Sequence, residues 1–187
     1  MWGRLANPLV YRQVINNSTS WTVPDRVSSA YVSIAGGGAG GVSGFDTGVS
    51  NPTNMISGAR AGFLERYPVN LTPGEVIPIV IGAGAPPAPY KLGQRGGTTS
   101  FGSYLSCTGG GNPGQEAWSA IGNCGTHGGN GIRGNYVMSS GGELLGGSIP
   151  MGYGSGGSVH RCVGCNPSTP TVGAWGQNGV VIIDMIY

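Results

Sequence analysis

The chain has 187 residues, of which 9% are charged and 39 are glycine, and its formal net charge is +2. About a quarter of the residues of a globular domain are usually charged, so solubility here must come from the backbone and from Ser, Thr and Asn. A small net charge without a cluster of Lys or Arg argues against a surface that follows a polyanion, which needs several phosphate contacts at physiological salt. We therefore expect no nucleic-acid partner.

The N-terminal residues predict neither a signal peptide nor membrane insertion. Met1-Trp2-Gly3-Arg4 is not followed by the apolar core of a signal peptide, and no window reaches the apolar length of a membrane-spanning helix. We expect synthesis in a cytoplasm. Residues Met1–Ser20 show no clear period and end in a polar run, which predicts an arm or attachment segment with one short strand. The alternative is an edge strand of the chain's own domain.

Short β-strands with Gly and Pro between them are predicted next. Alternating apolar positions predict a strand over Ala30–Ile34 that stops at Gly36. Further strand patterns occupy Ala61–Leu71, Val76–Ile81, Thr98–Cys107 and Val180–Tyr187. Pro68 restricts the first of these four to an edge or an end, and the turn Thr72-Pro73-Gly74-Glu75 predicts a hairpin between the first and the second.

The fold class expected from these patterns is all-β. Apolar residues rarely recur at helical spacing, and glycine interrupts every long window. A parallel sheet would need crossover helices, so the pattern favours a jelly-roll-like antiparallel sandwich.

The run Gly36–Gly41 satisfies the G-x-G-x-x-G dinucleotide fingerprint directly after a predicted strand. Phosphate binding by that motif requires a following helix and an acidic residue about twenty positions later. The next residues, Val42–Gly48, do not form a helical pattern. We therefore reject a nucleotide site.

The residues from about Cys107 to Gly179 form a glycine-rich region with strand patterns on both sides. Glycine loses the most backbone entropy on folding, so such a region is ordered only if its main chains pack tightly. Because apolar β-formers follow it, we expect an ordered insertion within a domain of residues 21–187. Polyproline II helices that bond laterally through glycine are the expected structure.

Large side chains at the turns of such a lattice could be displayed on a stiff frame for recognition. The candidate receptor-binding residues are Trp118, Tyr136, Tyr153, His160, Arg161 and Trp175. The alternative is that they only cover the glycine layer.

The order of these pieces resembles the glycine-rich C-terminal domain of bacteriophage tail-fibre and tail-tip proteins. The resemblance rests on Trp21-Thr22-Val23-Pro24, on the glycine run after the first strand, on Leu71–Gly84, on Gly96–Gly102 and on the closing Gly179–Ile183. A more distant similarity is to the glycine-rich extracellular region of the anaplastic lymphoma kinase receptor family.

The resemblance implies a non-enzymatic protein of the virion tail that binds the bacterial host surface. It also implies a homo-oligomer, possibly a trimer, with residues Met1–Ser20 attached to other tail proteins. The alternative is a purely structural baseplate or fibre adaptor, and a weaker alternative is a glycan-acting hydrolase.

Cys107, Cys124, Cys162 and Cys165 all lie in the glycine-rich region. Cys124 with His127, and Cys162 with Cys165, have spacings that suit a tetrahedral zinc ion, so a structural metal is one prediction. Disulfides are the other, because they persist outside the cell; unpaired thiols are the third. No other cofactor is expected.

Catalytic residues are not predicted. The seven acidic residues are scattered, and no nucleophile elbow is present. His160 lies close to Cys162 in the sequence, but adjacency is a poor indicator of catalytic geometry.

Overall fold

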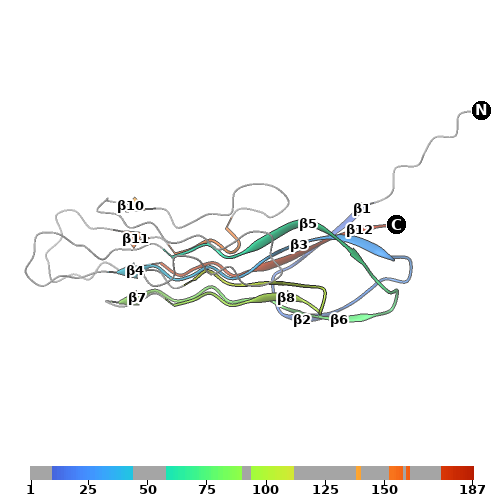
Figure 1. Cartoon of the computed structure of the whole chain (residues 1–187), viewed down its shortest axis with the longest axis horizontal. Helices are drawn as coiled ribbons and strands as arrows, with labels where there is room; N and C mark the ends of the chain where they lie inside the picture. The colour runs from blue at the N-terminus through green and yellow to red at the C-terminus, as the bar shows by residue number, and fades with distance from the viewer. Residues whose placement is uncertain are drawn as a thin grey trace, which may run out of the picture.

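A computed structural model describes residues 10–43, 58–89, 94–111, 138–139, 152–157, 159–160 and 174–187. Every regular element in these ranges is a β-strand, which confirms the all-β class. Figure 1 shows an elongated molecule with the long strands near the C-terminus and extended segments running from them toward the other end. Over the described ranges there is no helix that could cross a membrane.

Eight strands form two four-stranded antiparallel sheets. The first sheet has the order β1 (Val10–Ile15), β12 (Val180–Ile186), β3 (Ser29–Ala35) and β5 (Phe63–Asn70). The second has the order β2 (Thr19–Thr22), β6 (Val76–Val80), β8 (Thr99–Phe101) and β9 (Leu105–Cys107). Two short pairs complete the strands, β4 (Val42–Ser43) with β7 (Ala88–Pro89) and β10 (Met138–Ser139) with β11 (Val159–His160).

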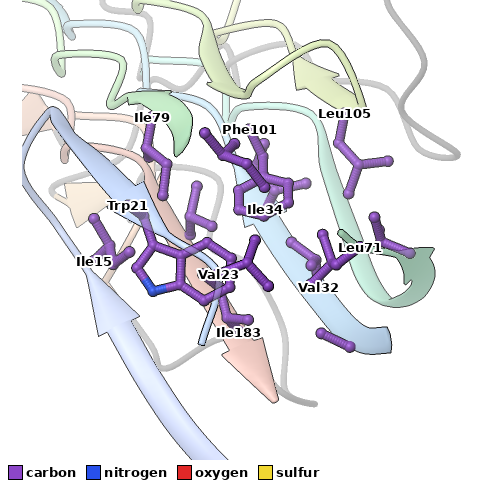
Figure 2. Close-up of a cluster of buried hydrophobic side chains, with 14 of the residues drawn as sticks. Ile15, Trp21, Val23, Val32, Ile34, Leu71, Ile79, Phe101, Leu105 and Ile183 are labelled. Atoms are coloured by element: carbon purple, nitrogen blue, oxygen red, sulfur yellow. The ribbon is translucent and has the colours of Figure 1, made fainter. Parts of the chain in front are cut away.

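One apolar core lies between the two sheets, as in a β-sandwich. The first sheet contributes Val32, Ile34 and Ile183, among others, and the second contributes Ile79 and Phe101. Figure 2 shows these side chains converging from both sides, with Trp21 beside them. The ring of Phe101 lies 5.9 Å from that of Trp21 and 5.9 Å from that of Tyr104, measured between centroids.

The C-terminal strand predicted from Val180–Tyr187 is confirmed as β12, an inner strand of the first sheet. All its residues from Val180 to Met185 are buried. Val181, Ile183 and Met185 enter the sandwich core, whereas Val180 and Ile182 pack on the opposite face with Ala35. A strand covered on both faces needs apolar residues at nearly every position, which explains the continuous run.

The hairpin predicted between the patterns Ala61–Leu71 and Val76–Ile81 is wrong. β5 pairs with β3, and β6 pairs with β2 and β8, so the Pro-Gly turn carries the chain from one sheet to the other. Main-chain bonds close this turn against the segment after β2, since Gly74 N–H donates to the Val23 carbonyl at 2.9 Å. Leu71 before the turn and Ile77 after it enter the same core from opposite sheets.

The single strand predicted over Thr98–Cys107 is two strands in the structure. β8 and β9 form a hairpin, and Gly102 between them has a φ of +51°, a conformation that favours glycine. The chain reverses there because Tyr104 N–H donates to the Phe101 carbonyl at 3.1 Å.

The N-terminal segment contains two strands where one was predicted. β1 is the edge strand of the first sheet, paired with β12 from Val10↔Ile186 to Ile15↔Val181. β2 belongs to the second sheet and pairs with β6. Residues 10–20 are thus part of the sandwich, and residues 1–9 lie outside the described residues.

Phe101→Ala should lower the free energy of unfolding by about 3 to 5 kcal/mol, because it empties a site between two other rings in the centre of the core. Urea unfolding measures this change. Val76→Ala is the control, since Val76 is 60% exposed and its loss should cost little. Equal destabilisation by both variants would contradict this assignment of the core.

Candidate functional site

A layer of extended, non-strand segments continues from the sandwich. We call it the glycine layer; it comprises residues 36–41, 58–62, 82–85, 94–97, 108–111, 152–157 and 174–179. Its segments lead into or out of strands: residues 36–41 follow β3, and residues 174–179 precede β12. Figure 1 shows them side by side along the long axis.

Residues 36–41 lie at the centre of the glycine layer. Their N–H groups donate in turn to residues 58–62, 94–97 and 174–179, and the order then repeats. Gly38, for example, donates to the Gln177 carbonyl at 2.8 Å, and Gly41, three residues later, donates to Ala174 at 3.0 Å. Each neighbour therefore meets every third residue of the central segment.

Three further segments approach the same residues from other directions. The N–H groups of Ala85, Gly110 and Gly157 donate to the carbonyls of Gly38, Gly37 and Ala39 respectively, at 2.8 to 2.9 Å. The central segment is thus hydrogen-bonded to six others. Its buried peptide groups find main-chain partners although it belongs to no sheet, as buried polar groups must.

This arrangement explains the composition of Gly36–Gly41, where Ala39 has the largest side chain. A Cβ atom added at Gly38 would overlap the carbonyl of Ser155, and one added at Gly40 would overlap that of Pro86. The obstacles are backbone atoms, which cannot turn aside as a flexible side chain can. Close packing of main chains therefore requires glycine here.

The sequence prediction placed the lattice at about residues 107–179. Residues 36–41, 58–62, 82–85 and 94–97 also belong to the glycine layer, and its centre is the run that matches the nucleotide motif, outside the predicted lattice. Short glycine runs after three predicted strands were the available signal. Periodicity within one segment could not find the layer because each segment contacts segments distant in the sequence.

The structure describes the side chains of two of the six candidate receptor-binding residues. Tyr153 is half-buried and packs on the cluster of Ala35, Val180 and Ile182, whereas Trp175 is 61% exposed. The backbone of His160 lies in β11. Trp118, Tyr136 and Arg161 lie outside the described residues.

Cys107 is the one candidate cysteine within the described residues. It is fully buried at the end of β9, and its sulfur is part of a disulfide. The sulfur also lies 3.7 Å from the Ile34 carbonyl oxygen, which is a packing contact because a disulfide sulfur has no proton to donate. Cys124, His127, Cys162 and Cys165 lie outside the described residues, so the pairing stays open.

Asp184 is a buried carboxylate on the outer face of the first sheet that the sequence pattern did not identify. Asp184 is 1% exposed and receives two hydrogen bonds from Arg12, of 2.6 Å from Nε and 2.9 Å from a terminal nitrogen. Arg66 approaches from the other side at 3.4 Å. Arg12 lies directly opposite Asp184 in the β1–β12 register, so β1 is fixed to the sheet by side chains as well as by its main chain.

A β-bulge positions Arg66. Two residues of β5 stand opposite Ser33, and Arg66, with a φ of +48°, donates its N–H to the Ser33 hydroxyl at 2.9 Å. Its guanidinium then lies 4.9 Å from the centroid of the Tyr31 ring. The hydrogen bond from Arg12 holds the pKa of Asp184 below its usual range; burial opposes this effect, and the charges of Arg12 and Arg66 add to it.

The oxygens of Asp184 already have partners within the protein. Both partners of Asp184 are cations that occupy its oxygens. Over the part of the chain that the structure describes, no three His, Cys, Asp or Glu side chains gather as a metal site would require. The cluster is therefore a structural ion network.

Comparisons with models of protein families and with curated proteins found no match for this chain. The case for a function therefore depends on its own residues and contacts.

Gly38→Ala should destabilise the protein by at least about 3 kcal/mol or prevent folding, because the added Cβ meets backbone on a buried segment. Thermal and urea unfolding measure the loss. The matched control is Gly74→Ala, where nothing lies within 4 Å of the added Cβ and only the φ of +79° opposes alanine, at about 1 kcal/mol. A Gly38→Ala variant as stable as this control would refute the packing described for the central segment.

Asp184→Asn should lower the free energy of unfolding at neutral pH by about 2 kcal/mol, because the two arginines lose their anion. The folded pKa of Asp184 lies below the unfolded value of about 4. Its contribution is therefore present above that value and is lost as the pH falls through the folded pKa.

The difference between the wild type and Asp184→Asn should accordingly shrink in acid, as urea unfolding at neutral and acidic pH would measure. Asp25→Asn is the control, because Asp25 is exposed in a turn and should match the wild type throughout. A difference that is constant with pH would show that Asp184 does not act through its charge.

Proposed function

We propose that this chain is a non-enzymatic tail-fibre or tail-tip protein of a bacteriophage, located in the virion tail, that binds the bacterial host surface. The observation that carries the proposal is the glycine layer, in which one central segment is hydrogen-bonded to six others. A frame held by main-chain bonds is stiff, and a stiff frame lowers the entropy lost when its side chains bind a partner.

The proposal includes polyproline II structure for the segments of the glycine layer. Such a helix has three residues per turn and no internal hydrogen bonds, so its peptide groups point outward in three directions. The three-residue repeat of donors along residues 36–41 supports this conformation. Residues 58–62 repeat it, since Gly58 and Ala61 donate to Gly157 and Gly154, three residues apart.

Receptor contact is assigned to large side chains carried by this frame. Trp175 belongs to the glycine layer and is 61% exposed. A partner that covers this apolar side chain would remove it from water, which favours binding. Trp118, Tyr136, His160 and Arg161 are proposed on sequence grounds alone.

A structural adaptor is the second candidate, and the edge strand β1 favours it. Val10, Tyr11 and Val14 are 59%, 60% and 46% exposed on a strand whose outer side pairs with no described strand. Exposed sheet edges readily pair with another chain. Attachment to tail proteins through residues 1–20, or formation of a homo-oligomer, would cover these side chains.

Binding of the labelled full chain to a panel of bacterial strains distinguishes the two candidates. An adhesin should bind at least one strain and block adsorption of phage to it. If neither occurs, even after the chain is oligomerised through a tag, the adaptor should replace the adhesin. Release of oligosaccharide from cell envelopes would instead favour the glycan-acting hydrolase.

Trp175→Ala should weaken cell binding by about tenfold, as expected for a central aromatic contact. The free energy of unfolding should change by less than about 0.5 kcal/mol, because the side chain is exposed. Flow cytometry of labelled protein measures the binding. Tyr67→Ala, at 48% exposure on β5, is the control and should bind normally. Equal binding by all three proteins would remove Trp175 from the receptor site.

A further inference from the structure

A pocket of about 410 Å³ lies where the sandwich meets the glycine layer. It is lined by Asn16, Asn17, Gly152, Tyr153, Gln177 and Asn178. Three stretches distant in the sequence meet there: the link between β1 and β2, the turn at residues 152–154, and the segment before β12. Its volume falls within the range of small-molecule sites.

The walls of this pocket are held by bonds that leave its side chains available. Gly154 N–H donates to the Asn178 carbonyl and Gln177 N–H donates to the Ser155 carbonyl, both at 2.8 Å, so two of the three stretches are joined. The Ser18 hydroxyl accepts the N–H of Ile81 at 2.9 Å and fixes the third. A site whose backbone is already ordered loses little entropy on binding.

Three of the four carboxamides, those of Asn16, Asn17 and Asn178, take part in hydrogen bonds within the protein. Asn178 accepts the N–H of Gly84 through Oδ1 at 2.9 Å, which leaves its amide hydrogens for a ligand. Asn17 donates to Asn16 Oδ1 at 3.0 Å, which leaves the Asn17 oxygen as an acceptor. The described structure gives the side chain of Gln177 no hydrogen bond, although its main chain is bonded on both sides.

The lining selects a class of ligand by its chemistry. Its described lining residues include no charged side chain, so they offer an ion no counter-charge and a hard cation no carboxylate. These same residues include no aliphatic side chain, so an apolar molecule would leave their amides unpaired. Carboxamides both donate and accept, as hydroxyl groups do, and the Tyr153 ring offers an apolar face.

We propose that this pocket binds a neutral polyhydroxylated ligand, a small saccharide, through the carboxamides of Asn17, Gln177 and Asn178 and the ring of Tyr153. The inference stands independently of the proposed adhesin, whose receptor contact is assigned to other residues of the frame. A fibre with no affinity for cells could still bind a saccharide here, and a fibre that binds cells could lack affinity for a saccharide at this pocket.

Saturation-transfer NMR on the full chain tests the proposal, with the methyl glycosides of glucose, galactose and N-acetylglucosamine as probes. At least one probe should receive saturation. Gln177→Ala and Asn17→Ala should each weaken its binding by about tenfold, the effect of losing one good hydrogen bond. Both side chains are exposed, so thermal unfolding should be unchanged. Asn70→Ala is the matched control, because Asn70 is an exposed carboxamide at the end of β5, outside the pocket lining, and should bind normally.

Absence of transfer to all three neutral glycosides would overturn the proposal, as would normal binding by both carboxamide variants. Stronger transfer to the methyl glycoside of N-acetylneuraminic acid than to every neutral glycoside would overturn the neutral ligand class. Saccharide binding without any cell binding would confirm the pocket and count against the adhesin. Cell binding without saccharide binding would support the adhesin and overturn the saccharide site.

Discussion

Main-chain hydrogen bonding around Gly36–Gly41 is the constraint on which the rest of the structure depends. A segment that is bonded to six neighbours has no free direction for a side chain, so glycine is required by geometry at most of its positions. Unpaired peptide groups would be costly in this buried setting. The three neighbours that accept its N–H groups must therefore keep one register, in which each meets every third residue of the centre.

The sandwich supplies that register. Residues 36–41 continue β3, residues 58–62 lead into β5, and residues 174–179 lead into β12. Once β3, β5 and β12 are paired in one sheet, the segments that extend from them already lie side by side. Ordering glycine costs conformational entropy, and the glycine layer has few apolar side chains whose burial could offset that cost. The apolar core of the sandwich thus offsets it.

The ion network at Asp184 ties the edge strand β1 to the first sheet of a chain with few charges. Arg12 on β1 and Arg66 on β5 both reach Asp184 on the strand between them in the sheet order. The bulge at Arg66 directs the second cation toward Asp184. It requires an uncommon backbone conformation at Arg66. The carboxamides at the junction pocket are neutral, and the ligand class proposed for them is neutral as well.

The sequence by itself determined the all-β class and predicted strands over residues 30–34, 61–71, 76–81 and 180–187, which are strands 29–35, 63–70, 76–80 and 180–186 of the structure. It restricted the strand with Pro68 to an edge or an end, and the structure places that strand at an edge. Only the tertiary structure decided that the Pro-Gly turn crosses between sheets and that Gly36–Gly41 is the centre of a layer. It alone brought Arg12 to Asp184 and Asn17 to Gln177. Those contacts join residues far apart in the sequence, and a glycine run looks the same whether it ends a strand or lies among six neighbouring backbones.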